Sequence, residues 1–78
     1  MQMSEVKEPY VMRLPEEPEL EVLQGIVGGY VEAMYTRKGE LMFVNEEGRV
    51  LQLPHNVEAS HLAGRDIVGN AVIIGESK

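Results

Sequence analysis

Two adjacent glycines, Gly28 and Gly29, separate two patterns of apolar residues that cannot belong to one element. Before them, residues 20–27 carry apolar side chains at three- and four-residue spacings, which is typical of one face of a helix. After them, Tyr30–Tyr35 alternates with a period of two, which is typical of a half-buried strand. We therefore expect Gly28 to end a helix in the left-handed conformation and Gly29 to let the chain reverse tightly into the strand.

The segment before the glycines predicts one main helix, over residues 16–27. Pro18 suits the first helical position, because its fixed φ fits a helix and its missing N–H would have no partner there. Four glutamates, at positions 16, 17, 19 and 21, fit the positive end of the helix dipole. Residues 10–14 favour a short edge strand that Pro15 closes.

Two turn signals divide the segment after the glycines. Residues 36–40, which contain Gly39, predict a turn into a returning strand over 41–45. Asn-Glu-Glu-Gly at 45–48 predicts a second turn, in which Gly48 supplies a positive φ. Residues 49–53 then predict a third strand, stopped by Pro54, so that the three strands form an antiparallel meander.

The remaining segment predicts a short helix and a last strand. Asn56 is placed to cap a helix over 57–62, which Gly64 ends. Residues 67–74, with Gly69 in the middle, favour the final strand. The predicted fold is therefore α+β, with one main helix packed on a small, mostly antiparallel sheet and a short second helix. We expect a single domain over residues 10–75, a loose N-terminal tail over 1–9 and a C-terminal tail over 76–78.

Size and charge limit the partners. With 78 residues and no cysteine, the chain has a small core and no disulfide, so we expect a homo-oligomer, most simply a dimer. The net charge of −6, with scattered basic residues, argues against direct binding of nucleic acid. No apolar run has the length of a membrane span, so we expect no membrane association and a cytoplasmic location.

Four short motifs follow one another in order. They are Leu-Gln-Gly-Ile-Val-Gly-Gly-Tyr-Val-Glu at 23–32, Asn-Glu-Glu-Gly at 45–48, Leu-Pro-His-Asn-Val-Glu-Ala at 53–59 and Asp-Ile-Val-Gly-Asn-Ala-Val-Ile at 66–73. Over about residues 20–75 the chain resembles a family of small domains of unknown function that are frequent in phages, plasmids and other mobile or viral genomes. The resemblance implies an accessory protein of a mobile element or its host, and it implies no catalytic residues.

No motif predicts catalysis or a cofactor. The glycines do not match a phosphate-binding loop, because here the helix precedes the strand and a phosphate would meet the negative end of the dipole. His55 and His61 are six residues apart and lack the helical spacing of a metal pair, even with Glu58 between them. No serine lies in a nucleophile motif. We therefore expect a protein that is not an enzyme, with no cofactor, no metal and no catalytic residue.

Polar and basic residues beside the turns are candidates for a binding site. The polar ones line a pocket or, as an alternative, satisfy buried backbone groups; they are Gln24, Tyr30, Asn45 and Asn56. The basic candidates are Arg37 and Arg49, with Lys38 and Arg65 as further donors for an anion. The residues assigned a structural role are Gly28, Gly29, Gly48 and Pro54.

Three functions remain open. The leading hypothesis is a non-enzymatic interaction module, acting as an oligomer on a host or phage protein through an acidic face. The alternative is capture of a small polar, nucleotide-like ligand in a cleft between subunits near Gln24, Tyr30 and Asn45. A second alternative is an acidic DNA mimic. Convergence of two of the four basic residues on one cleft would favour capture, whereas scattered cations and clustered glutamates would favour interaction.

Overall fold

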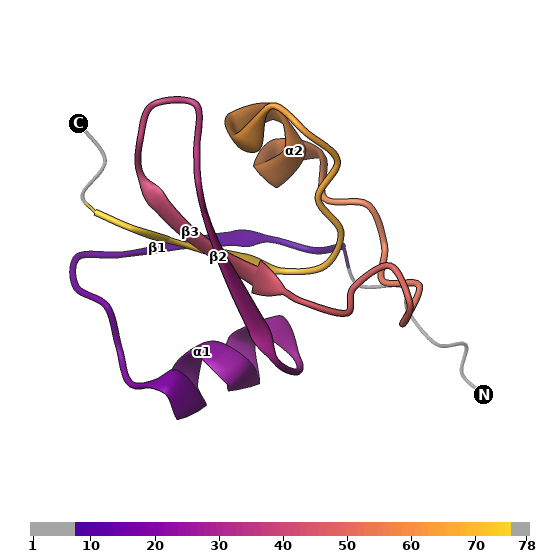
Figure 1. Ribbon diagram of the computed structural model, residues 1–78, viewed down its shortest axis with the longest axis horizontal. Helices are drawn as coiled ribbons and strands as arrows, with labels where there is room; N and C mark the ends of the chain where they lie inside the picture. The colour runs from indigo at the N-terminus through magenta and orange to yellow at the C-terminus, as the bar shows by residue number, and fades with distance from the viewer. Residues whose placement is uncertain (1–7, 76–78) are drawn as a thin grey trace.

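The computed structural model describes residues 8–75 and shows a four-stranded sheet with one helix on each face (Figure 1). The elements are β1 (Val11–Leu14), α1 (Leu20–Val27), β2 (Val31–Tyr35), β3 (Leu41–Asn45), α2 (Val57–Ala63) and β4 (Ala71–Ile74). The predicted α+β class, with a main helix and a short second one, is confirmed. The predicted tails fall largely on residues 1–7 and 76–78, which lie outside the described residues.

The sheet has the order β1-β4-β3-β2, so the last strand of the chain lies inside it and β1 and β2 form the two edges. β2 and β3 are an antiparallel hairpin, in which Ala33 lies opposite Phe43. β4 runs antiparallel to β3 and parallel to β1, with Val11 opposite Ala71. The predicted edge position of β1 is confirmed, and α1 crosses one face of the sheet on its way from one edge strand to the other.

The prediction of a third meander strand over residues 49–53 was wrong. Residues 46–52 form a run of tight turns, closed by Leu51 N–H to Glu47 C=O and Leu53 N–H to Gly48 C=O at 2.9 and 3.0 Å. The free side of β3 is taken by β4, whose four residues are all apolar. A strand buried on both faces needs such a run. Residues 49–53 contain an arginine and a glutamine, so they cannot compete for that place.

Two details of the main helix and its flanks also differ from prediction. α1 begins at Leu20 with Glu19 as its N-cap, so Pro18 precedes the helix rather than opening it. Gly48 has no positive φ. Its small size matters instead, because a Cβ there would lie 2.6 Å from Val68 Cγ2. The predicted cap at Gly28 is confirmed, with φ of 86° and its N–H bonded to Gln24 C=O.

Gly29 has a packing role rather than a special backbone angle. Its φ is not positive, and its N–H shares the Gln24 carbonyl with Gly28. A Cβ at this position would lie 3.0 Å from Asn45 Nδ2, the amide that donates to Val27 C=O. The glycine pair therefore ends α1 and admits the asparagine side chain that ties the helix end to β3.

Alternation along the strands divides the core between the two faces. On the α1 face, Leu23 and Val27 pack against Phe43 and Val72. On the α2 face, the buried cluster consists of Met42, Val44, Ala59, Ile67, Ala71 and Ile73. Because β3 and β4 supply residues to both clusters, the centre of the sheet is buried on both sides.

The second helix begins as predicted, but the last strand is shorter. Asn56 caps α2 by accepting the Ala59 N–H, and Gly64 ends the helix with φ of 75°. The strand predicted over 67–74 starts only at Ala71, because Gly69 bends the chain with a positive φ of 79°. Neither helix of residues 8–75 combines the length and the apolar character needed to cross a bilayer.

Candidate functional site

The α2 face of the sheet is covered by α2 together with the turns after β3 and the loop after α2. A cleft of about 310 Å³ opens there beside β2. We call it the arginine cleft and define it by Glu32 and Met34 of β2, Val44 of β3, Arg49 of the turns after β3, and Arg65, Ile67 and Val68 of the loop after α2. The cleft is thus built from three separate parts of the sequence.

Arg49 is positioned by the run of turns that replaces the predicted strand. Asn45 starts this run, since its buried Oδ1 accepts the Glu47 N–H at 2.7 Å. Gly48 then packs against Val68, which brings the turns up to the loop after α2. Arg49 C=O accepts the Gln52 N–H at 3.0 Å, so the backbone of Arg49 is held within the turns.

Arg65 is positioned by the end of α2. Gly64 directs the chain away from the helix axis, and the Arg65 N–H bonds to Ser60 C=O at 3.3 Å. Two residues later, Ile67 is buried and exchanges hydrogen bonds with the Ser60 hydroxyl. The arginine therefore lies on a short loop that is fixed at both ends.

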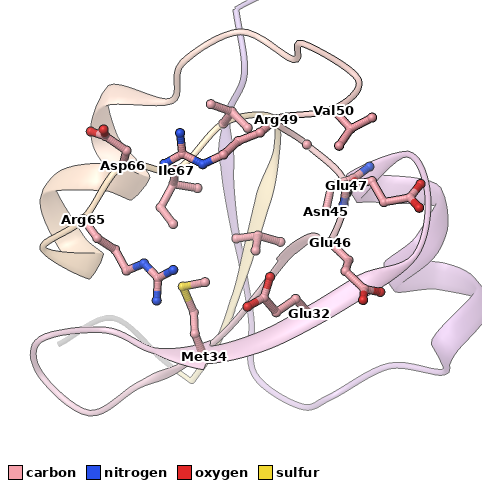
Figure 2. A pocket seen from close by; sticks show the side chains of 13 residues that line it. Glu32, Met34, Asn45, Glu46, Glu47, Arg49, Val50, Arg65, Asp66 and Ile67 are labelled. Atoms are coloured by element: carbon pink, nitrogen blue, oxygen red, sulfur yellow. Dashed lines mark hydrogen bonds between the residues drawn. The ribbon is translucent and has the colours of Figure 1, made fainter.

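The two arginines extend into the cleft from opposite sides (Figure 2). Four acidic residues also line the cleft. The Glu32 carboxylate points into the hollow, whereas those of Glu46, Glu47 and Asp66 point away from it. The ion pairs among residues 8–75 are Arg13 with Glu40 and His55 with Asp66. Neither cleft arginine belongs to one of them. Two guanidinium groups therefore face a partly apolar floor, and no carboxylate of residues 8–75 is bound to either.

The predicted polar candidates divide into two groups. Gln24 and Tyr30 line a separate, shallow depression at the glycine pair. Asn45 is buried and donates to Val27 C=O at 3.1 Å, in addition to its bond to Glu47. Asn56 is 1% exposed, caps α2 and donates to Tyr10 C=O and Gly69 C=O. The polar atoms of both asparagines are thus occupied by backbone groups, which is the alternative role that the sequence left open.

The basic candidates also separate. Arg37 lies with Lys38 and His61 at the C-terminal end of α2, away from the arginine cleft. Its backbone N–H bonds to Leu62 C=O at 2.9 Å, and its side chain approaches His61 C=O. Of the four basic residues considered, Arg49 and Arg65 are the pair that meets in a cleft with an apolar floor.

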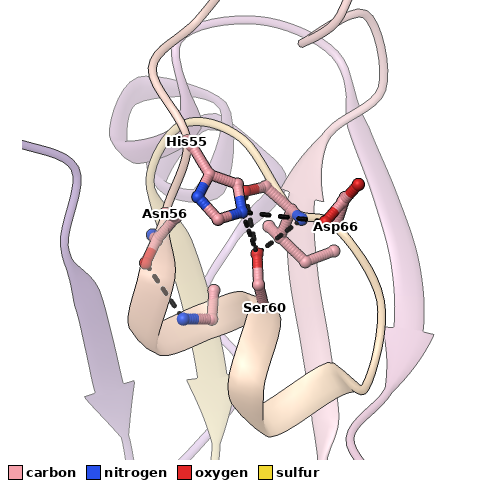
Figure 3. Close-up of polar contacts among 6 residues, drawn as sticks. His55, Asn56, Ser60 and Asp66 are labelled. Atoms are coloured by element: carbon pink, nitrogen blue, oxygen red, sulfur yellow. Dashed lines mark hydrogen bonds and ion pairs between the residues drawn. The ribbon is translucent and has the colours of Figure 1, made fainter.

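His55, Ser60 and Asp66 lie together, and these are the residue types of a hydrolase triad (Figure 3). The geometry is different. The Ser60 hydroxyl and the Asp66 carboxylate approach the same ring nitrogen, Nε2 of His55, at 3.1 and 3.8 Å. A triad requires them on opposite nitrogens. The Ser60 oxygen also accepts the Ile67 N–H at 2.7 Å, so this cluster holds the loop rather than presenting a nucleophile.

Metal ligation has no comparable support in residues 8–75, where no three His, Asp or Glu side chains gather closely enough to hold an ion.

Pro54, which was expected to stop a strand, instead accepts the Gly69 N–H at its carbonyl at 2.8 Å. It thereby joins the segment after the turns to the one before β4.

Sequence reasoning did not select Glu32, Met34 or Ile67 as site residues. The alternation of β2 places Glu32 and Met34 on one face of the sheet, and this signal was available. That the open part of the face lies above them depends on where α2 ends and how the loops fold back. These are long-range features that no local motif encodes.

Comparison with known proteins places the chain in a family without assigning a function. No curated protein and no solved structure matches it. A family model matches residues 2–78, nearly the whole chain. On this match, the chain belongs to the family described as a domain of unknown function, DUF3846.

Proposed function

We propose that this protein is a non-enzymatic binding module that captures a small organic anion of the nucleotide class in the arginine cleft. The observation that carries the proposal is the meeting of Arg49 and Arg65, sixteen positions apart in the sequence, in one cleft. We further propose, from the sequence resemblance, that the protein serves a mobile element or its host.

The arginines supply the recognition of an anion. A guanidinium group presents several N–H donors in a plane and binds phosphate or carboxylate in a bidentate manner. Two such groups on opposite walls would bind one phosphate from two sides. Since neither is in an ion pair within residues 8–75, binding would not first require breaking one.

The rest of the cleft narrows the class of ligand. Glu32 accepts hydrogen bonds, so it suits a hydroxyl or amino donor on the same molecule as the anion. The floor of Met34, Val44, Ile67 and Val68 offers apolar contact to a ring. A volume of about 310 Å³ is at the low end for small-molecule sites, which range from roughly 300 to 1,000 Å³. A phosphate, a hydroxyl-bearing sugar and a flat base together meet these requirements.

Isothermal titration calorimetry with the four common nucleoside monophosphates, the matching nucleosides and inorganic phosphate tests the proposal. We expect at least one monophosphate to bind and its nucleoside to fail. Arg49→Ala and Arg65→Ala should each weaken binding by about tenfold to a hundredfold, because each removes a charge-assisted hydrogen bond of roughly 1.5–3 kcal/mol.

Lys38→Ala is the control, since it removes a positive charge from an exposed residue of the β2–β3 turn that does not line the cleft. It should leave the affinity within about twofold, as expected for an exposed, screened charge outside the site. Equal losses from the three variants would mean general attraction by charge and would contradict a defined site. Binding of none of the probes would remove the nucleotide class from the proposal.

An acidic interaction surface is the second candidate. Glu16, Glu17, Glu19 and Glu21 are all exposed, and none is in an ion pair within residues 8–75. They lie within one short segment at the start of α1 and are not spread along a face, which suits a basic protein partner better than imitation of a DNA strand. Replacing all four with glutamine should abolish co-purification of such a partner from host lysate while leaving nucleotide binding intact.

A further inference from the structure

The outer edge of β2 is open. Glu46 N–H bonds to Tyr30 C=O and Thr36 N–H to Glu40 C=O, both at 2.8 Å, so these pairs frame the hairpin ladder. In an antiparallel ladder every second residue bonds to its partner strand. The N–H and C=O groups of Val31, Ala33 and Tyr35 therefore point away from β3, and no strand of residues 8–75 lies beside them.

This edge has less protection against pairing than β1. Natural edges are protected by proline, by bulges, by charged side chains or by covering loops. β2 carries one such charge, Glu32, and has no bulge against β3. β1, the other edge, has four residues and is flanked by Pro9 and Pro15. β2 has five residues in regular register with β3 and no flanking proline, and Ala33 and Tyr35 are exposed. The two edges differ, and the open one borders the arginine cleft.

We propose that β2 pairs with β2 of a second copy of this chain, antiparallel and centred on Ala33, to form one continuous sheet through a symmetric dimer. This register is self-complementary. On the α1 face, Val31 lies opposite Tyr35 of the partner subunit, an aromatic and β-branched pair that stabilises sheets. On the α2 face, Glu32 lies opposite Met34 of the partner subunit, so no like charges are directly opposed.

Charge gives a second reason for a copy of the same chain. Arg65 and Met34 line the same cleft, and the Arg65 side chain points toward Met34 (Figure 2). Directly opposed Cβ atoms in a non-hydrogen-bonded pair are about 5 Å apart, so the partner's Glu32 arrives beside Met34 and within reach of Arg65. The two-fold axis makes this contact twice. Arg65, which is in no ion pair within residues 8–75, thereby gains a carboxylate in each subunit.

The pairing also joins the two arginine clefts across the dimer axis, and this step rests on the proposed function. Each cleft gains the partner's Glu32 at its β2 side. A guanidinium group has five N–H donors, so Arg65 can bind this carboxylate and the ligand anion together. The dimer interface and the ligand site would then share one residue, and nucleotide binding should depend on the dimer.

Sedimentation without nucleotide tests the dimer independently of ligand capture. We expect the wild-type chain to reach twice the 8.7-kDa monomer mass as its concentration rises, and Ala33→Pro to remain at the monomer mass. Proline removes an N–H that the monomer does not use, and edge positions of this kind tolerate it. A wild-type monomer at all concentrations, or a dimer retained by a folded Ala33→Pro variant, would overturn the proposal.

Because the natural chain has no cysteine, single-cysteine variants map the register. Ala33→Cys should form a disulfide-linked dimer on mild oxidation, since Cα atoms of a hydrogen-bonded antiparallel pair are about 5.5 Å apart, within the range a disulfide spans. Val57→Cys is the control, at a position that is 73% exposed but belongs neither to β2 nor to the cleft lining. Equal cross-linking at both positions would indicate random collision and contradict the register.

Charge reversal keeps the test informative if Ala33→Pro fails to fold. Glu32→Arg and Arg65→Glu should each weaken the dimer by about tenfold, because each places like charges together twice per dimer. The double variant should recover the dimer affinity. Failure of the double variant to recover would overturn the Arg65 contact, whereas failure of nucleotides to bind in calorimetry would leave the dimer result standing.

Discussion

The two faces of the sheet are covered by different means. On one face, α1 runs from one edge strand to the other and buries Leu23 and Val27 against the sheet, so contact between apolar side chains holds it. The other face is covered by the shorter helix, α2, and by two loops. Side-chain to backbone hydrogen bonds from Asn56 and Ser60 hold this helix and these loops in place. A helix leaves little open space beneath it, whereas loops fixed at separate points leave a cleft. We therefore expect a ligand to bind on the α2 face, where the cover is looser. We expect packing on the α1 face to contribute more to the free energy of unfolding.

Leu23→Ala should produce the largest loss of stability, because it empties a site that is 2% exposed beneath α1. We expect the free energy of unfolding to fall by about 3 kcal/mol, as for other buried leucines. Chemical denaturation followed by circular dichroism measures it. Leu20→Ala, in the same helix but 55% exposed, should cost below about 0.5 kcal/mol. Similar losses at both positions would contradict apolar packing as the means of cover on this face.

Asn56→Ala should have the next largest effect, since it removes the cap of α2 and two bonds to the loops. We expect a loss of about 2 kcal/mol, because a cap contributes about 1 kcal/mol and buried partners are left unpaired. Asn70→Ala is the comparison: this half-buried side chain joins Tyr10 N–H to Ile26 C=O, and we expect about 1 kcal/mol. If Asn56→Ala were neutral, hydrogen bonds would not be what fixes the α2 face.

Two glycine substitutions give the smallest effects, with opposite signs on the two faces. Gly48→Ala should destabilise by about 1 kcal/mol, because its Cβ would collide with Val68 beside the cleft. Gly25→Ala, inside α1 with no atom within 4 Å of the added Cβ, should stabilise by about 0.8 kcal/mol through helix propensity. Differential scanning calorimetry resolves both changes. If both substitutions changed the free energy of unfolding in the same direction, the two faces would tolerate an added methyl group alike.

Local rules predicted much of the fold, and long-range competition decided the rest. The caps at Gly28, Asn56 and Gly64 were confirmed, because each depends on a few neighbouring residues. The prediction of a strand over 49–53 was wrong. The position beside β3 is filled by the segment that can be buried there at the lowest free-energy cost, and this segment is β4, which lies far along the chain.

The candidate site was less predictable than the fold. Its walls come from β2, from the turns after β3 and from the loop after α2, so no single motif contains it. Arg49 and Arg65 were among the four basic residues singled out. Their meeting, and the separation of Arg37 and Lys38 from them, follow from how far α2 extends over the sheet.

The interior position of β4 sets the order in which this protein can assemble. The ribosome makes β4 after every other element, yet β1 has no other strand to join, since Val11 pairs with Ala71 sixty residues later. Until Ala71–Ile74 emerges, the β2–β3 hairpin is the one part of the sheet that can form. A nascent chain stalled before residue 71 would thus expose the edge of β3 that β4 covers and leave Phe43 without its neighbour Val72, and chaperones or proteases would meet it in that state.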